Sequence, residues 1–349
     1  MDICIVGGGN LGHTLAGYLG AKPGIRIFML TSRPSQFSPE LSVVDASGLE
    51  RRVGLAGVSS SPGDVVPGCD LVIQCLPAYL VRSSLEAIGP HLKAGACVGT
   101  VFGSTGFFYA ALEVLPNHCL FAMQRVPFIA RVLEYGSRAE IKGYKKDLLV
   151  RVENSADPKA VGAQLEELFD LPVRLAEHHL QVTLSNSNPL LHTARMYTMW
   201  KDYKPGMVYP HNPDFYCDWT VEASRLLLSM DEEFQQLVAA LPISLSRLEP
   251  VLEFYEAQDA ASLTEAIAGH EWFVGIKSPM RGVEGGWAPD FDSRYFVEDF
   301  LFGMHYLVAE GKNWGVSMPQ TMEVYRWGYG CVEAYSSFRL EDYGRAKPL

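Results

Sequence analysis

Residues 2–19 of the chain read DICIVGGGNLGHTLAGYL, and this stretch determines what fold the first half is expected to have. Ile3–Val6 is a short apolar run that predicts a strand, and leucines at helical spacing follow it. The turn between them carries the pattern G-x-G-x-x-G, formed by Gly7, Gly9 and Gly12. A strand, a glycine-rich turn and a helix in this order predict the first βαβ unit of a doubly wound domain.

Each residue of this turn has a separate physical role in such a unit. Gly7 permits the tight turn, Gly9 lets the backbone approach a pyrophosphate, and Gly12 allows the helix to pack closely on the strand. Asn10 and Leu11 begin the helix, whose free N–H groups and positive dipole end attract phosphates. We therefore predict a dinucleotide site at these five residues; the alternative is a glycine-rich turn that binds no ligand.

The end of the second strand, Ile25–Leu30, bears on which dinucleotide binds. An acidic residue about 20 positions after the loop would bind the ribose 2′-hydroxyl of NAD, but Thr31 stands there. Thr31 and Ser32 can donate hydrogen bonds to a phosphate, and Arg33 can pair with one bidentately. The sequence thus favours NADP(H) over NAD(H), unless Arg33 is only a solvated loop charge.

Further strands and helices alternate up to about residue 177. Apolar runs predict strands at Asp70–Cys75, Ala96–Phe102, Cys119–Met123 and Leu148–Val152, and Pro158–Phe169 is predicted to be a helix. Strands that alternate with helices indicate a parallel sheet. Cys75, Leu76 and Pro77 end the first of these strands at its carboxyl edge, where the nicotinamide half of the cofactor would bind. Residues 1–177 are therefore predicted to form a Rossmann domain.

Helical patterns dominate residues 178–349. They are predicted at Leu184–Trp200, Val221–Leu241, Arg247–Ala257, Ser293–Ala309 and Pro319–Ala334. Residues Trp272–Asp292 are rich in glycine and proline and are expected to form a loop. The predicted fold class is α/β, with the doubly wound domain followed by an all-α domain.

Composition excludes several classes of function. The net charge of −11 argues against nucleic acid or an acidic membrane as a partner. The seven cysteines are scattered and lack CxxC spacing, which argues against disulfides and against a bound metal. No signal peptide or membrane span is predicted, so we expect a cytoplasmic protein.

Two stretches of the second half contain residues suited to acid–base chemistry. In LSNSNPLLHTARMY, Asn188 and Arg195 are expected on the same helix face as His192. In SRYFVEDFLFGM, Arg294 and Asp299 lie in an otherwise apolar helix. Each also has a plain interpretation: a core histidine satisfied by its neighbours, and charges that face water.

Together with the glycine loop, these motifs resemble the opine dehydrogenases, the octopine and nopaline dehydrogenase group. The resemblance covers nearly the whole chain and includes CLP after the strand, QRVPF from Gln124, NPLLH and RYFVED. It implies that His192 and Asp299 form a catalytic dyad and that Arg294 contacts the cofactor pyrophosphate.

The reaction of that family is reductive condensation. A 2-oxo acid and the amino group of an amino acid form an imine, which NAD(P)H reduces. A histidine oriented by a carboxylate suits the proton transfers involved. Gln124, Asn188 and Arg195, with Lys277, are the candidates for binding the substrate carboxylates. The partners implied are the two small substrates, and a homodimer is left open.

Two alternatives remain at this point. One is a two-domain oxo-acid reductase related to ketopantoate or glycerol-3-phosphate dehydrogenases, which would use a lysine such as Lys201, Lys204 or Lys277. The other is a non-catalytic NADP sensor. A sensor needs no buried acid–base pair, so the presence of both His192 and Asp299 counts against it.

Overall fold

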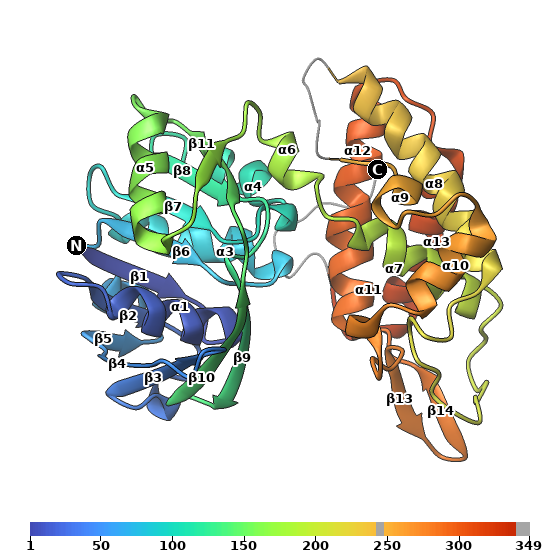
Figure 1. Ribbon diagram of the computed structural model, residues 1–349, viewed down its shortest axis with the longest axis horizontal. Helices are drawn as coiled ribbons and strands as arrows, with labels where there is room; N and C mark the ends of the chain where they lie inside the picture. The colour runs from blue at the N-terminus through green and yellow to red at the C-terminus, as the bar shows by residue number, and fades with distance from the viewer. Residues whose placement is uncertain (242–247, 340–349) are drawn as a thin grey trace. The chain divides into compact units, whose positions relative to one another are not determined.

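The computed structural model describes residues 1–241 and 248–339, apart from the side chains of Thr105 and Trp272. The chain forms two compact units, Met1–Ser185 and Asn186–Leu349 (Figure 1). The first unit is an α/β domain and the second is mainly helical. This is the order of fold classes that the sequence predicts.

An eight-stranded sheet forms the centre of the first unit. Its strand order is β12-β11-β8-β7-β6-β1-β2-β5, in which the chain winds outward in both directions from β1. The strands are β1 (Asp2–Val6), β2 (Arg26–Leu30), β5 (Gly57–Ser59), β6 (Leu71–Gln74), β7 (Cys97–Thr100), β8 (Cys119–Met123), β11 (Leu148–Glu153) and β12 (Val173–Leu175). The helices of this unit are α1 (Asn10–Gly20), α2 (Pro62–Val65), α3 (Ala78–Ile88), α4 (Phe107–Val114), α5 (Pro158–Phe169) and α6 (Leu180–Thr183).

One strand runs against the predicted direction. The strand predicted at Leu148–Val152 belongs to a parallel series in the sequence interpretation, but β11 pairs antiparallel with β8. The reason is the connection, because no helix crosses between β8 and β11; two further strands, β9 (Phe128–Glu134) and β10 (Arg138–Tyr144), lie between them in the chain. A parallel neighbour requires a crossover, which α5 then provides between β11 and β12.

A second sheet, which the sequence did not predict, packs on α1. Its strand order is β4-β3-β10-β9, with β3 at Glu40–Asp45 and β4 at Glu50–Gly54. Two glycines of α1 allow the close approach: a Cβ on Gly17 would lie 2.1 Å from Val43, and one on Gly20 would lie 2.5 Å from Val53. The helix is thus enclosed on both sides, which explains why Gly12–Leu19 is buried all round.

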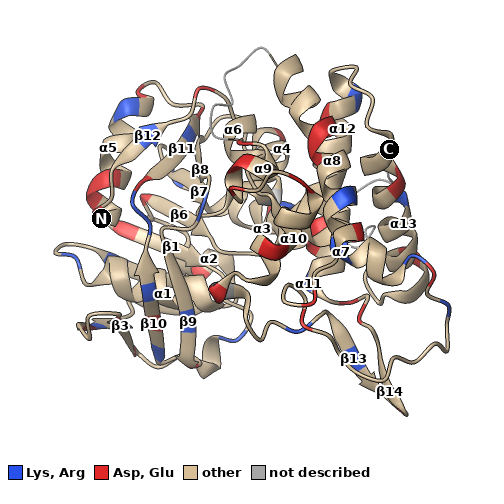
Figure 2. Cartoon of the chain, turned by 45° about the vertical axis from the view of Figure 1, so that its right-hand side comes forward, with Lys and Arg blue, Asp and Glu red and all other residues tan. Residues whose placement is uncertain are grey.

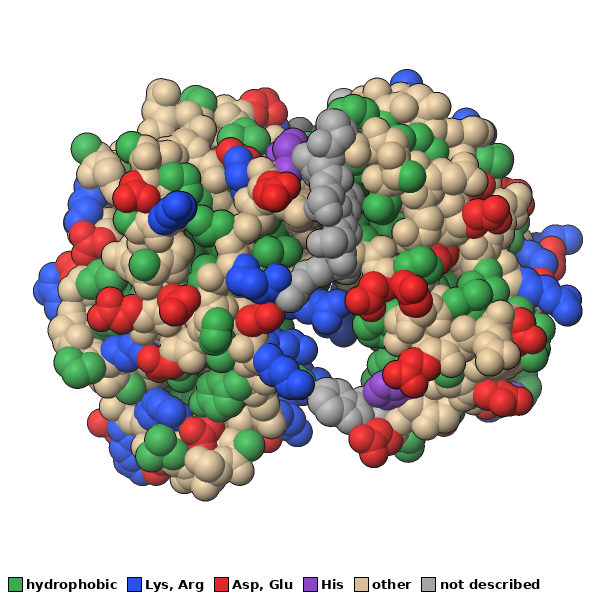
Figure 3. All heavy atoms as spheres, turned by 45° about the horizontal axis from the view of Figure 1, so that its top comes forward, with side chains coloured by type: hydrophobic (Ala, Val, Ile, Leu, Met, Phe, Trp, Pro, Cys, Tyr) green, Lys and Arg blue, Asp and Glu red, His purple; other side chains and the backbone are tan. Residues whose placement is uncertain are grey.

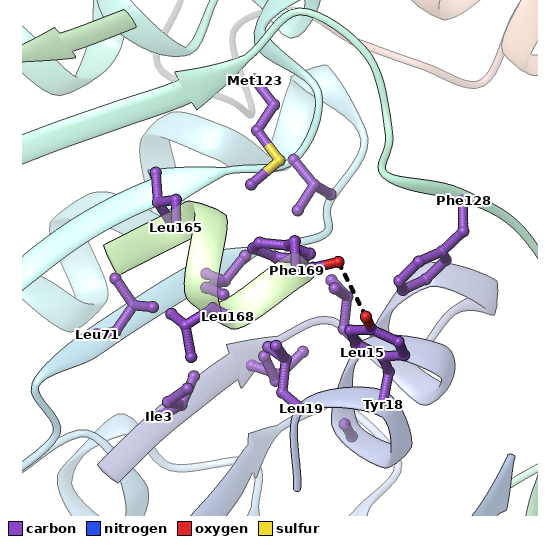
Figure 4. Close-up of a cluster of buried hydrophobic side chains, with 14 of the residues drawn as sticks. Ile3, Leu15, Tyr18, Leu19, Leu71, Met123, Phe128, Leu165, Leu168 and Phe169 are labelled. Atoms are coloured by element: carbon purple, nitrogen blue, oxygen red, sulfur yellow. Dashed lines mark hydrogen bonds between the residues drawn. The ribbon is translucent and has the colours of Figure 1, made fainter. Parts of the chain in front are cut away.

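The core between α1, α5 and the large sheet is shown in Figure 4. Leu15 and Leu19 of α1 are fully buried there with Leu165 and Phe169 of α5. At its edge, the Tyr18 hydroxyl donates to the Phe169 carbonyl oxygen at 2.9 Å. This bond satisfies a buried polar group and ties the first helix of the unit to a much later one.

The second unit contains α7 (Asn188–Trp200), α8 (Val221–Ala240), α9 (Val251–Phe254), α10 (Ala260–Ala268), α11 (Arg294–Glu298), α12 (His305–Asn313) and α13 (Pro319–Tyr335). The helix predicted from Leu184 begins only at Asn188, and Pro189 lies in its first turn, where the missing N–H of proline costs no helical hydrogen bond. The predicted helix Ser293–Ala309 is interrupted by a π-helical segment, η5 (Asp299–Met304). The helix predicted at Arg247–Ala257 shortens to α9, and Arg247 itself lies outside the described residues.

The loop predicted at Trp272–Asp292 contains a hairpin of β13 (Met280–Val283) and β14 (Gly286–Pro289). Glu284 and Gly285 form the turn, and Gly286 begins β14; the two glycines have φ of +84° and +152°, conformations that favour glycine. The Trp287 backbone also exchanges two hydrogen bonds with Tyr209, at 2.9 and 2.8 Å. The helical unit is therefore not purely α-helical, because glycines that indicated a loop serve here as hairpin residues.

Basic and acidic residues are spread along the chain of both units (Figure 2), and on the face drawn in Figure 3 each unit carries charged side chains of both signs. Within residues 1–241 and 248–339, no helix is long and apolar enough to cross a membrane. The same residues contain no group of three or more His, Cys, Asp or Glu placed to hold a metal ion.

Candidate functional site

The three glycines of the loop differ in what surrounds them. Gly7 has φ of +112°, and a Cβ there would lie 2.7 Å from the Cys75 carbonyl oxygen. A Cβ on Gly12 would lie 1.8 Å from the Gly7 carbonyl oxygen, so only glycine lets α1 start so close to β1. A Cβ on Gly9, by contrast, would meet nothing within 4 Å. The protein does not require a glycine at position 9 for its own packing, which leaves open space beside that backbone.

The N-terminus of α1 offers donors to an anion. Gly9 is the N-cap residue without a side chain, and the first turn carries no acidic residue. The side chain of Asn10 is used structurally, since its Oδ1 accepts a hydrogen bond of 2.8 Å from the Val132 amide of β9. The free backbone N–H groups of this turn, including those of Leu11 and Gly12, suit phosphate oxygens.

His13 is a residue of this site that the sequence interpretation missed. Its Nδ1 donates to the Gly9 carbonyl oxygen at 2.9 Å, and its Nε2 accepts from the Gly136 amide at 2.7 Å. Burial lowers the pKa of His13, in keeping with a neutral ring that has one donor and one acceptor. The ring therefore joins the glycine loop to the β9–β10 turn. The sequence signal that could have identified His13 is its position four residues after Gly9, one helical turn into the helix that follows the glycine loop.

The three residues after β2 do not share one environment. Thr31 is buried, and its Oγ1 would lie 2.6 Å from a Cβ on Gly8, so it packs beneath the glycine loop. Ser32 and Arg33 are exposed, and the Arg33 guanidinium lies 5.7 Å from the centre of the Tyr135 ring. Ser32 and Arg33 are thus free to meet a ligand at this strand end, whereas the Thr31 hydroxyl already accepts the Arg33 amide.

The carboxyl ends of β6 and β7 carry polar atoms without partners. Cys75 and Leu76 contact the glycine loop, with a Leu76 methyl group 3.1 Å from a Cβ placed on Gly7, and Pro77 is the N-cap of α3. Gln74 Oε1 and Ser104 Oγ are buried and make no hydrogen bond to the part of the chain that the structure describes. Buried polar atoms are normally paired, so a ligand with polar groups would satisfy these two.

In the second unit, His192 and Asp299 are joined by a hydrogen bond of 2.7 Å between Nδ1 and Oδ2. Both side chains are buried, and they come from α7 and the first residue of η5. A Cβ on Gly303 would lie 2.5 Å from Pro189, so this glycine allows η5 to pack against the start of α7. Such π segments are frequent at functional sites. A carboxylate on Nδ1 places the proton there and leaves Nε2 as an acceptor.

The other ring nitrogen of His192 contacts a residue that the sequence interpretation also missed. The Tyr216 hydroxyl lies 2.7 Å from Nε2. Tyr216 is buried, its ring stacks on Phe273 at 4.1 Å, and burial raises the pKa of its hydroxyl. The only local signal was the aromatic run FYCDW in a stretch without helical periodicity.

The predicted substrate ligands are placed differently from one another. Arg195 is buried and donates to the carbonyl oxygens of Phe215 and Asp218, at 3.2 and 2.5 Å, and burial lowers its pKa to about 10. Asn188 is half-buried at the first residue of α7, and Gln124 is buried directly after β8. Arg195 therefore has a structural role, in holding the segment Phe215–Asp218, in addition to any role in ligand binding.

The remaining basic candidates are exposed. The Arg294 guanidinium lies 5.6 Å from the ring centre of its neighbour Tyr295. Lys277 pairs with Asp214 at 2.8 Å, and Lys201 pairs with an exposed glutamate at 2.7 Å. Solvated ion pairs of this kind keep a lysine charged, which gives no support to a lysine-based acid–base mechanism.

Comparison with known proteins agrees with this architecture. Residues 175–331 match the family described as NAD/NADP octopine/nopaline dehydrogenase, alpha-helical domain. The octopine dehydrogenase of Pecten maximus is 25% identical over 361 residues, which cover 94% of this chain and 89% of that protein.

Solved structures share the fold over the same extent. Octopine dehydrogenase in its form with NADH and L-arginine aligns with a TM-score of 0.80 at 24% identity, covering 95% of this chain and 90% of that one. Yersinopine dehydrogenase with NADP+ bound aligns with a TM-score of 0.69 at 14% identity, covering 96% and 91%.

Proposed function

We propose that this chain, whose residues 175–331 match the octopine/nopaline dehydrogenase family, uses NAD(P)H to reduce the imine formed from a 2-oxo acid and an amino acid. The observation that carries this proposal is the buried hydrogen bond of 2.7 Å between His192 and Asp299. These residues are far apart in the sequence and are the two that the family resemblance assigned to proton transfer. The relative of known structure binds NADH with L-arginine, and a further structure of it holds pyruvate.

The first unit fits a dinucleotide. Open space at Gly9, the free amides of α1 and the unpaired polar atoms of Gln74 and Ser104 suit a pyrophosphate and a polar ring. We assign the ribose end to Ser32 and Arg33, which favours NADPH, whose 2′-phosphate a guanidinium binds bidentately. When bound, the cofactor supplies the hydride. We also assign Arg294 to its pyrophosphate, as the family resemblance implies.

The second unit supplies the proton chemistry. Formation and reduction of the imine release the carbonyl oxygen as water and consume one proton, so a general acid is required. Asp299 keeps the proton of neutral His192 on Nδ1 and stabilises the imidazolium that forms when Nε2 is protonated. His192 is thereby an acid in the direction of condensation and a base in the reverse direction.

Binding of the substrate carboxylates is assigned to amide and cationic side chains. Gln124 and Asn188 offer amide groups, and Arg195 keeps N–H groups beyond the two that it uses for backbone carbonyls. We further propose that Met280 and Trp287 of the hairpin help to exclude water from the imine, which hydrolysis would otherwise destroy.

The test is a matrix of 2-oxo acids against amino acids, followed by NADPH oxidation and by mass spectrometry of the product. We expect turnover only when both substrates are present, and a secondary amine whose mass equals both substrates joined with loss of one oxygen. Rapid oxidation with an oxo acid alone, giving the hydroxy acid, would instead identify a simple reductase. His192→Ala serves as the control for background reduction.

A further inference from the structure

The catalytic nitrogen of His192 faces a hydroxyl group of the protein itself. Nε2 is the atom that must exchange a proton with substrate, because Nδ1 is held by Asp299. Yet the Tyr216 hydroxyl lies 2.7 Å from Nε2, and both residues are 6% exposed. A substrate atom therefore reaches Nε2 only by displacing Tyr216, or exchanges its proton through Tyr216.

Displacement is opposed by the way Tyr216 is held. Arg195, one turn after His192 on α7, donates to the carbonyl oxygens of Phe215 and Asp218, on either side of Tyr216. The Tyr216 ring also lies nearly parallel to Phe273, with 4.1 Å between ring centres and 17° between planes. The same helix thus fixes both the histidine and the segment that presents the hydroxyl.

The hydrogen-bond directions follow from the charges. With the Nδ1 proton facing Asp299, neutral His192 accepts at Nε2, so the Tyr216 hydroxyl donates to it and keeps two lone pairs. When His192 is protonated, Nε2–H donates to the Tyr216 oxygen, and the hydroxyl proton is released to point elsewhere. The charge on His192 therefore decides whether Tyr216 presents a donor or an acceptor to a ligand.

We infer that Tyr216 is a catalytic residue that carries the proton between His192 and the substrate oxygen; this inference rests on the proposed function. In condensation, the His192 imidazolium gives its Nε2 proton to the Tyr216 oxygen, while the Tyr216 hydroxyl proton passes to the carbinolamine oxygen. The C–O bond breaks, its electron pair leaves with the oxygen as water, and the nitrogen lone pair forms the C=N bond. His192 is left neutral, with its remaining proton on Nδ1.

The test compares Tyr216→Phe with a matched variant, Tyr325→Phe. Tyr325 is also buried and also hydrogen-bonds a histidine, His305, at 2.9 Å, but Tyr325 lies in α13 and His305 in α12, outside the proposed site. We expect Tyr216→Phe to lower kcat about 10²-fold, with KM and NADPH affinity near those of the unaltered protein. Tyr325→Phe should leave kcat unchanged and lose only stability.

The 15N NMR signals of His192 separate a relay from a positioning role. In Tyr216→Phe the proton should remain on Nδ1, because Asp299 is unchanged, so a loss of kcat with this tautomer retained supports the relay. A kcat close to that of the unaltered protein would overturn the inference, and so would a loss of kcat accompanied by loss of the Nδ1–H tautomer. If the protein instead reduces an oxo acid alone, the proposed function fails, yet the same comparison decides the relay, because a carbonyl oxygen also needs a proton.

Discussion

A single added methyl group separates the structural and the binding roles of the glycine loop. Gly12→Ala and Gly9→Ala are the same chemical change three residues apart in one turn. At position 12 the new Cβ would lie 1.8 Å from the Gly7 carbonyl oxygen, whereas at position 9 it would meet nothing within 4 Å. The first variant should therefore disturb the fold and the second should disturb only ligand binding.

The magnitudes follow from these contacts. A Cβ against backbone forces α1 away from β1, and overpacking of this kind costs about 1–3 kcal/mol or more. At about 2–4 °C per kcal/mol, the Tm of Gly12→Ala should fall by roughly 2–12 °C. Gly9 has φ of −88° and ψ of −166°, which alanine also adopts, so stability should change by about 1 kcal/mol or less.

Gly9→Ala, which should barely change stability, should weaken the binding of NADPH. The methyl group on residue 9 would occupy the space where we propose that the pyrophosphate approaches the backbone. Loss of one hydrogen bond to a charged group costs about 1.5–3 kcal/mol, or roughly a 10- to 150-fold weaker Kd for NADPH. Thermal unfolding and fluorescence titration of NADPH measure the two effects separately. If Gly9→Ala bound NADPH as tightly as the unaltered protein, the cofactor would not lie against this turn and the reasoning would be refuted.

Three other predictions concern the cofactor, the dyad and pH. Arg33→Ala should abolish a preference for NADPH over NADH of roughly 10- to 150-fold, and equal affinities in the unaltered protein would show that Arg33 is only a surface charge. His192→Ala should lower kcat by about 10²–10⁴-fold without changing NADPH affinity, and Asp299→Asn should also lower kcat. Arg294→Ala should instead weaken the binding of the cofactor. A His192→Ala variant that kept its activity would remove the dyad from the mechanism. Burial, followed by the neighbouring histidine, lowers the pKa of His179 to about 4, below its ordinary value of 6.5. As the pH falls, His179 is protonated in the unfolded chain before it is protonated in the folded protein. The stabilisation that neutral His179 contributes to the free energy of unfolding should therefore be fully present above pH 6.5 and should decrease as the pH falls toward 4. Urea unfolding at several pH values should show a smaller decrease for His179→Gln, and identical slopes for both proteins would contradict the assignment.

Local patterns determined a large part of this protein. The strand at β1, the glycine loop and the helix α1 are encoded within one short stretch, and the helix Pro158–Phe169 was predicted to the residue. In these cases the signal and the structure occupy the same few residues, because periodicity, glycine conformation and helix starts are local properties. Motifs of the second half named His192 and Asp299 only through a family resemblance, since neither spacing nor composition shows that the two side chains meet.

The tertiary structure decided what depends on contacts between distant segments. The second sheet joins β3 to β10 across most of the first unit, and the antiparallel direction of β11 follows from the absence of a crossover helix. In the second unit, Asp299 at the start of η5 meets His192 of α7. Arg195 holds the segment that contains Tyr216, which has no periodicity of its own, so that the Tyr216 hydroxyl lies at Nε2 of His192. Sequence patterns indicate the local conformation of a segment and which of its faces is buried. Which hydroxyl faces which ring nitrogen depends on packing between segments that are distant in the sequence, and no local pattern encodes that contact.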